Sequence, residues 1–326
     1  MNQKEKLNRI SLILLSLFVV MLGYGILLPT LPYYTERLAL KENPDTDLIN
    51  FHIGLLTSIY PFFQLLFVVV WGKLSDKYGR KPIIICGLIG FVVMQLLTGL
   101  ATALTMLYMA RILGGIFTSA VIPVGNAYLS DITSEKRRTK IMAWSGVAIS
   151  SGVIFGPVLG SLLSQTNLHF KYSLGILHLD RFSIPFLLVA LLGFVILSIL
   201  IKWLGNTTPI SRFVSEAQKL SFSFSRFFTV LLLLSFVMQF VITLFETVFS
   251  IYGKNELLFS SNQIGIGFML CGVVMAVLQP VFATYGEKLL TAKQQIAAGL
   301  FISGISMIAF PFFNNKFAVY LLIIIF

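Results

Sequence analysis

Residues 72–82 have the sequence GKLSDKYGRKP and separate two long apolar runs, at about 52–71 and 82–101. The glycines allow a sharp turn and a close approach of two backbones. Asp76 and Arg80 stand where a helix meets a loop, so their opposite charges can pair across an interface. An ordinary basic loop that only fixes membrane topology is the alternative interpretation. The Asp and Arg bracketed by glycines favour a more specific structure.

Apolar runs recur along nearly the whole chain. Of its 326 residues, 57% are hydrophobic and 11% are charged, and a protein surrounded by water cannot bury that much apolar surface. About 20 apolar residues suffice for a helix to cross a bilayer. The alternating pattern of a membrane β-barrel is missing. The sequence therefore predicts an all-α membrane protein with spans at about 10–32, 52–71, 82–101, 104–128, 141–164, 183–204, 227–252, 263–284, 295–312 and from 317 onward.

The longest polar connection, residues 205–226, divides these spans into two groups. We expect an N-terminal six-helix bundle at 1–204, a cytoplasmic linker at 205–226 and a C-terminal bundle at 227–326. The last apolar run continues to the final residue. We therefore expect the chain to be part of a longer protein that stops here within its tenth helix, with an incomplete second bundle.

The 24 Lys and Arg residues indicate the orientation. With the N-terminus inside the cell, the inner segments hold 17 of them and the outer loops hold 6. Because inner loops of membrane proteins collect Lys and Arg, we expect a multi-pass plasma-membrane protein with a cytoplasmic N-terminus. The net charge of +11 could also indicate nucleic-acid binding. The basic residues are spread over five short segments instead of one face, which excludes that class.

Residues 72–82 closely resemble the signature loop of the major facilitator superfamily, G-x-L-x-D-x-x-G-R-K. The resemblance implies two six-helix bundles that move a small solute by alternating access. It also implies an inner gate, in which the Asp and Arg of the loop pair with an acid at the end of the fourth span. The residues that match this gate are Gly72, Asp76, Gly79, Arg80, Lys81 and Asp131.

Arg111 lies within the fourth span, in LYMARILGGIF. A charge at the middle of a membrane costs about 2.5–3.5 kcal/mol on insertion scales, so it is expected to face a cavity or a partner. A side chain that reaches the outer membrane surface is the alternative. The segment resembles the R-x-x-x-G motif of proton-coupled family members, which implies a role for Arg111 in proton coupling.

Small residues recur every four positions along the fifth span, which predicts a smooth helix face for close packing. Packing alone is one interpretation of this face. The fuller pattern also resembles the antiporter motif of the superfamily, although Ser161 replaces its last glycine. The resemblance implies an exporter that works by antiport, in contrast to the symporters of the superfamily. The matching residues are Gly146, Gly152, Gly156, Pro157 and Gly160.

Glu246 stands among Phe and Val residues in the seventh span, in FETVFSIY. Because burial raises the pKa of a carboxyl group, Glu246 is a candidate for taking up and releasing a proton near neutral pH. A position near the outer interface, where it would matter less, is the alternative. The segment resembles the seventh span of norfloxacin-type multidrug pumps, which implies that Glu246 lines the drug cavity and joins proton coupling.

The candidate substrate cavity is expected to include Tyr24, Gln64, Gln239 and Phe245. The chain contains 30 Phe residues, and most of them are expected to face lipid. Neither a catalytic constellation nor a metal site is expected, because the three His residues fall near outer loops and the two Cys residues have no ligand-like spacing. We expect no cofactor, and we expect a monomer whose partners are protons, lipophilic drug-like solutes and the bilayer.

The predicted function is therefore a secondary transporter that exports lipophilic, often cationic drugs in exchange for protons. Uptake of a sugar or metabolite is an alternative within the same superfamily, and so is lipid export. A membrane sensor or scaffold is the alternative outside transport. An enzyme is not expected.

Overall fold

The computed structural model of the chain describes residues 3–40, 46–164, 172–174, 177–179, 182–205, 226–313 and 315–325. The chain divides into two compact units, residues 1–215 and 216–326. Most of the expected linker, residues 206–225, lies outside the described residues. Its assignment stays a prediction.

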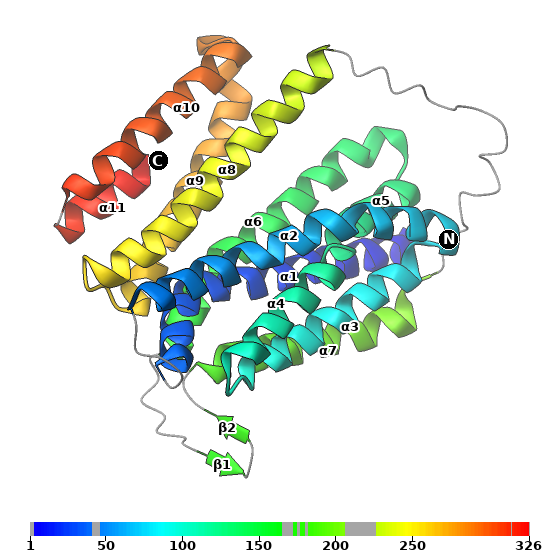
Figure 1. Ribbon diagram of the computed structural model, residues 1–326. Coiled ribbons are helices and arrows are strands. Elements are labelled where there is room, and N and C mark those ends of the chain that lie inside the picture. Colours follow the sequence, from blue (N-terminus) through cyan, green and yellow to red (C-terminus); the bar gives the residue numbers. More distant parts are fainter. Residues whose placement is uncertain are drawn as a thin grey trace. The chain divides into compact units, whose positions relative to one another are not determined.

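The first unit is a helical bundle with one short β-hairpin (Figure 1). The hairpin pairs its two strands antiparallel, with Tyr172 opposite Leu179. The elements are α1 (Gln3–Ala39), α2 (Thr46–Tyr78), α3 (Arg80–Gly99), α4 (Leu104–Thr118), α5 (Val121–Ile132), α6 (Glu135–Ser164), β1 (Tyr172–Leu174), β2 (Leu177–Leu179) and α7 (Ser183–Trp203).

The second unit contains helices, of which α8 is the longest (Figure 1). Its described elements are α8 (Arg226–Asn255), α9 (Ser261–Leu289), α10 (Ala292–Ala309), the 3₁₀ turn η2 (Phe310–Phe312) and α11 (Lys316–Ile325). The side chain of Thr291 accepts a hydrogen bond from the backbone of Gln294, whose side chain accepts one from the backbone of Thr291. This capping box fixes the start of α10.

Among the described residues, eight helices are long and apolar enough to cross a membrane. One of them, the fourth, runs through both α4 and α5. Two further apolar segments, the Ser261–Met275 part of α9 and the helix α11, fall at the expected eighth and tenth spans. The helical membrane fold expected from the sequence is therefore confirmed, and the short β1–β2 hairpin between α6 and α7 is a feature that the sequence did not predict.

The fourth span is broken between α4 and α5. The backbone N–H of Ala120 bonds to the carbonyl of Phe117 at 3.1 Å, instead of the carbonyl one residue earlier that an α-helix would use. The carbonyl of Ile116 instead accepts hydrogen bonds from Trp71 Nε1, at 2.6 Å, and from Ser119 Oγ, at 2.7 Å. These side chains take the place of the regular helix bond and separate the two segments.

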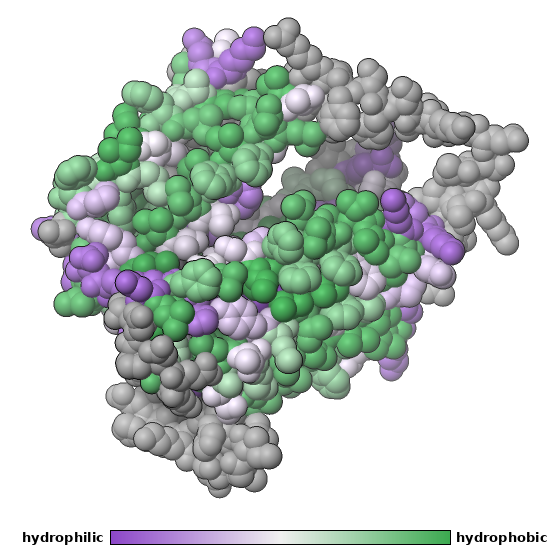
Figure 2. All heavy atoms as spheres, in the orientation of Figure 1, coloured by the Kyte–Doolittle hydropathy of each residue, from purple (hydrophilic) through white to green (hydrophobic). Residues whose placement is uncertain are grey.

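The surface of the described helices is apolar where a soluble protein would be polar. Figure 2 shows apolar residues over the sides of the helices and hydrophilic residues gathered mostly near helix ends. Phe236 is 67% exposed and Ile308 is 72% exposed. Large apolar side chains with such exposure are stable in contact with lipid tails.

Candidate functional site

The turn between α2 and α3 depends on Gly79. Its φ of 91° and ψ of 162° fall in a region that almost only glycine adopts, and a residue with a side chain there costs about 1–3 kcal/mol. One turn earlier, Ser75 Oγ donates a hydrogen bond to the carbonyl of Gly72 at 2.8 Å. A Cβ atom at Gly72 would meet nothing within 4 Å. Of the two glycines of this loop, Gly79 is the one whose conformation requires glycine.

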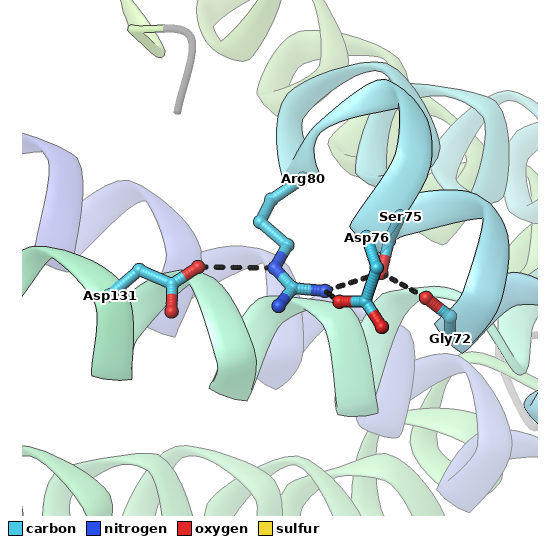
Figure 3. Close-up of polar contacts among 5 residues, drawn as sticks. All are labelled: Gly72, Ser75, Asp76, Arg80 and Asp131. Carbon is cyan, nitrogen blue, oxygen red and sulfur yellow. Dashed lines mark hydrogen bonds and ion pairs between the residues drawn. The ribbon is translucent and has the colours of Figure 1, made fainter. Parts of the chain in front are cut away.

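Arg80 lies at the centre of a polar cluster at this turn (Figure 3). Its Nη1 atom lies 2.6 Å from Asp76 Oδ1 and donates to Ser75 Oγ at 2.6 Å. Its Nε donates to Asp131 Oδ2, at the end of α5, at 3.1 Å. The Arg80 side chain is 10% exposed, whereas the side chains of Asp76 and Asp131 are 58% and 30% exposed. The guanidinium therefore bridges two carboxylates and links α2, α3 and α5.

Further contacts join the segments that the sequence places inside the cell. Lys81 Nζ donates to the carbonyl of Ile201, in the last turn of α7, at 3.0 Å. The Tyr128 hydroxyl donates to the carbonyl of Gly205 at 3.3 Å, and the guanidinium of Arg9, from α1, lies against Gly205. The start of α1, the α2–α3 turn and the end of α7 therefore gather at one end of the first unit.

Three glycines of α6 pack directly against the backbone of α1. A Cβ atom at Gly152 would lie 2.5 Å from the carbonyl oxygen of Phe18. At Gly156 it would lie 2.6 Å from Gly25 Cα, and at Gly160 it would lie 2.9 Å from the carbonyl oxygen of Ile26. These distances are shorter than those of real Cβ contacts, so the two helices approach more closely than any side chain would allow.

The other two residues of the expected antiporter motif are placed differently. Gly146 is exposed, and a Cβ atom there would meet nothing within 4 Å. Pro157 lies inside α6, where its ring faces Gly25 of α1. Gly146 therefore does not share the close contact that Gly152, Gly156 and Gly160 make with α1.

Arg111 is buried within the first unit, with 3% of its surface exposed. It lies seven residues after the start of α4, or about 10 Å along the helix axis. Its Nε donates to the carbonyl of Leu56 in α2 at 2.8 Å. Its guanidinium carbon lies 4.5 Å from the centroid of the Tyr60 ring, within the range of a cation–π interaction. The Arg111 side chain is therefore enclosed by its neighbours within the first unit.

A hydrogen-bonded network holds Tyr60 in place beneath Arg111. The hydroxyls of Tyr60 and Thr118 lie 2.7 Å apart. The Gln64 amide donates to the Tyr60 hydroxyl at 3.1 Å and to the Thr118 hydroxyl at 3.3 Å. The ring of Tyr24, from α1, lies 6.2 Å from that of Tyr60. Two of the expected cavity residues, Tyr24 and Gln64, thus contact Tyr60, the ring that packs against Arg111.

The second unit holds the other candidates, all on α8. Glu246 is half-buried, nine residues before the end of the helix and thus about 14 Å from it. Phe245 is buried and stacks on Phe249 with ring centroids 5.7 Å apart. Gln239 is exposed and donates to the Thr243 hydroxyl at 3.4 Å.

Sequence reasoning missed Ser75, Tyr60 and Thr118. The spacing of Tyr60 and Gln64, one helical turn apart in an apolar run, was the available signal for the network around Arg111. Nothing in the sequence joined Thr118 to these residues, because the contact spans two helices. Within the described part of the chain, no group of three or more His, Cys, Asp or Glu side chains could hold a metal ion.

The sequence model of the Major Facilitator Superfamily matches residues 13–326. The chain is 29% identical over 285 residues to multidrug resistance protein 2 of Bacillus subtilis, an alignment that covers 85% of the chain and 67% of that protein. It is 25% identical over 319 residues to the quinolone resistance protein NorA of Staphylococcus aureus, which covers 97% of the chain and 76% of NorA.

The fold is similar to that of a solved bacterial homologue of the human lysosomal transporter Spinster, in an inward-facing and occupied conformation. The TM-score is 0.78 at 15% sequence identity, and the match covers 100% of the chain and 72% of that structure. At this identity the likeness concerns the fold alone.

Proposed function

The chain belongs to the Major Facilitator Superfamily, and from that premise we propose that it exports lipophilic, often cationic drugs in exchange for protons by alternating access. The names of its relatives, a multidrug and a quinolone resistance protein, support drugs as the substrate class. The chain spans 67% and 76% of these two relatives.

One observation carries the proposal: ionisable side chains lie inside membrane-spanning helices. Arg111 is buried beside Tyr60, and Glu246 is half-buried in α8. Charged groups are expensive in a membrane and are retained where they serve an ion or a substrate. Glu246 takes up and releases the proton, and Arg111 contributes to the coupling. A sensor or scaffold has no need of either group.

The Arg80 cluster is proposed to be the inner gate. Its ion pairs with Asp76 and Asp131 tie α3 to α2 and α5, and they lie at the end of the unit where the basic segments gather. The N-terminus is proposed to be cytoplasmic, since 17 of the 24 Lys and Arg residues then lie inside. We propose a monomer.

Efflux of ethidium from cells that express the complete gene tests this proposal. The wild-type protein should lower the ethidium content of cells, and an uncoupler that collapses the proton gradient should abolish the effect. Glu246→Gln should lose most of the efflux at unchanged expression. Glu256→Gln, in an exposed position just after α8, is the matched control and should export normally.

Unchanged efflux in Glu246→Gln would refute the role of Glu246. Efflux that persists with the uncoupler would refute proton coupling. Uptake of a labelled sugar, with no drug efflux, would favour the sugar and metabolite importers of the superfamily.

A further inference from the structure

Arg111 is a permanent cation inside the first unit with no described carboxylate beside it. Its surface is 3% exposed, and the ion pairs found among the described residues belong to Arg80. Its one hydrogen bond to a described group runs from Nε to the carbonyl of Leu56. Asp131, the carboxylate on the same span, forms an ion pair with Arg80.

A guanidinium has five N–H donors, so four of them, on the two Nη atoms, have no acceptor among the described residues. A buried charge without a counter-charge is strongly destabilising. The face of the Tyr60 ring stabilises the charge in part through the cation–π interaction. This contact leaves the four Nη N–H groups, which point outward in the plane of the guanidinium, without an acceptor among the described residues. A planar group with two acceptor oxygens, such as a carboxylate, matches the unused Nη pair.

The surroundings hold the guanidinium in one orientation. Leu56 fixes the Nε edge at 2.8 Å, and the Tyr60 ring covers one face at 4.5 Å. The Tyr60 hydroxyl is in turn held by Thr118 at 2.7 Å and by Gln64 at 3.1 Å. An anion would therefore meet an arginine that is already positioned, so little conformational entropy would be lost on binding.

The aromatic side chains point to the kind of molecule that carries the anion. The rings of Tyr60 and Tyr24 lie 6.2 Å apart at a tilt of 32°. Tyr60 is buried under Arg111, whereas Tyr24 is partly exposed, and an aromatic ring of this kind favours a flat aromatic body beside it. We propose that Arg111 binds the carboxylate of aromatic acids and zwitterions among the transported substrates. This inference rests on the proposed drug export, and it adds substrate recognition to the coupling role of Arg111.

Equilibrium binding to the purified full-length protein tests the proposal. Three aromatic acids, norfloxacin, nalidixate and 2-naphthoate, are each compared with their methyl esters by titration calorimetry at a pH where the acids are ionised. Charge-assisted hydrogen bonds should make the acid bind about 10-fold more tightly than its ester, or more. Arg111→Gln should bring the ratio close to one. Met109→Leu, an exposed position on the same helix, is the control and should keep the preference.

Arg111→Lys keeps the charge but cannot bind a carboxylate through two parallel hydrogen bonds, so the preference for the acid over its ester should fall without vanishing. This variant and the acid–ester comparison on the wild-type protein keep the test decisive if Arg111→Gln does not fold. Equal binding of acids and esters to the wild-type protein, or no binding of any of the acids, would overturn the proposal. A ratio that survives in Arg111→Gln would also overturn it.

The arginine could instead serve a carboxylate of the protein itself. In that case Arg111→Gln would change the pH profile of efflux equally for acid and ester and leave their affinity ratio intact, which would refute substrate recognition. Proton-driven efflux of ethidium without any carboxylate preference would refute this inference alone. The absence of proton-driven efflux of any compound would refute the proposed function.

Discussion

Replacing Gly156 with alanine should push α1 and α6 apart. The new Cβ atom would lie 2.6 Å from Gly25 Cα and 2.7 Å from the carbonyl oxygen of Leu22, whereas ordinary contact begins at 3.4 Å. The helices would have to separate by about 0.8 Å at this point. Both contacted atoms belong to the backbone, so no side-chain rotation can relieve the overlap.

The expected loss of stability follows from two opposing terms. Overpacking a tight interface costs about 1–3 kcal/mol, and a contact with rigid backbone belongs at the upper end of that range. Alanine also has a higher helix propensity than glycine, which stabilises the folded state by about 0.8–1.0 kcal/mol. The net loss is therefore about 1–2 kcal/mol, which should lower the melting temperature by about 2–8 °C.

Gly146→Ala is the matched control on the same helix. A Cβ atom there meets nothing within 4 Å, so this variant should melt at the wild-type temperature or slightly above it. Thermal unfolding of the purified proteins in detergent measures both changes. Proteoliposomes with an imposed pH gradient give a second readout, because a loosened α1–α6 contact should let protons leak without substrate. Equal melting temperatures for the two variants would refute the close packing described for Gly156.

Three further changes have defined outcomes. Arg80→Gln removes the bridge between Asp76 and Asp131 and should strongly reduce ethidium efflux in cells. Lys77→Gln changes an exposed neighbour and should leave efflux unchanged. An equal loss of efflux in both variants would contradict the gate. Gly79→Ala forces a side chain into a φ of 91° and a ψ of 162° and should lower the unfolding free energy by about 1–3 kcal/mol in chemical denaturation; an unchanged unfolding free energy would be the contrary result. Tyr60→Phe keeps the ring under Arg111 but loses the bonds to Thr118 and Gln64; it should cost about 0.5–1.5 kcal/mol in the same assay, and a stabilised variant would argue against the network.

Hydropathy was sufficient to predict the membrane-spanning helices but not their ends. The second span was expected at 52–71, and α2 runs from Thr46 to Tyr78. A bilayer requires apolar residues only over its own thickness, so the polar turns beyond it leave no signal of this kind. The break between α4 and α5 also had no apolar signature, because the Trp71 side chain from α2 takes part in it.

The sequence predicted some residues of the candidate site and missed those that depend on contacts between helices. Arg111 and Glu246 are conspicuous because charges are rare in apolar runs. The Tyr60–Thr118 bond joins residues 58 positions apart, and only the packing of α2 against α4 brings them together. The glycines of α6 resembled a motif, but their contact with α1 and the exposure of Gly146 depend on how the helices pack.

Drug-driven proton movement in proteoliposomes tests the central claim most directly. The complete protein is reconstituted with a pH-sensitive dye inside the vesicles, without any initial gradient, and ethidium is added outside. Exchange of drug for protons predicts that the lumen becomes more alkaline as ethidium enters, and that Glu246→Gln abolishes the signal. Ethidium entry with no change in lumenal pH would contradict the account.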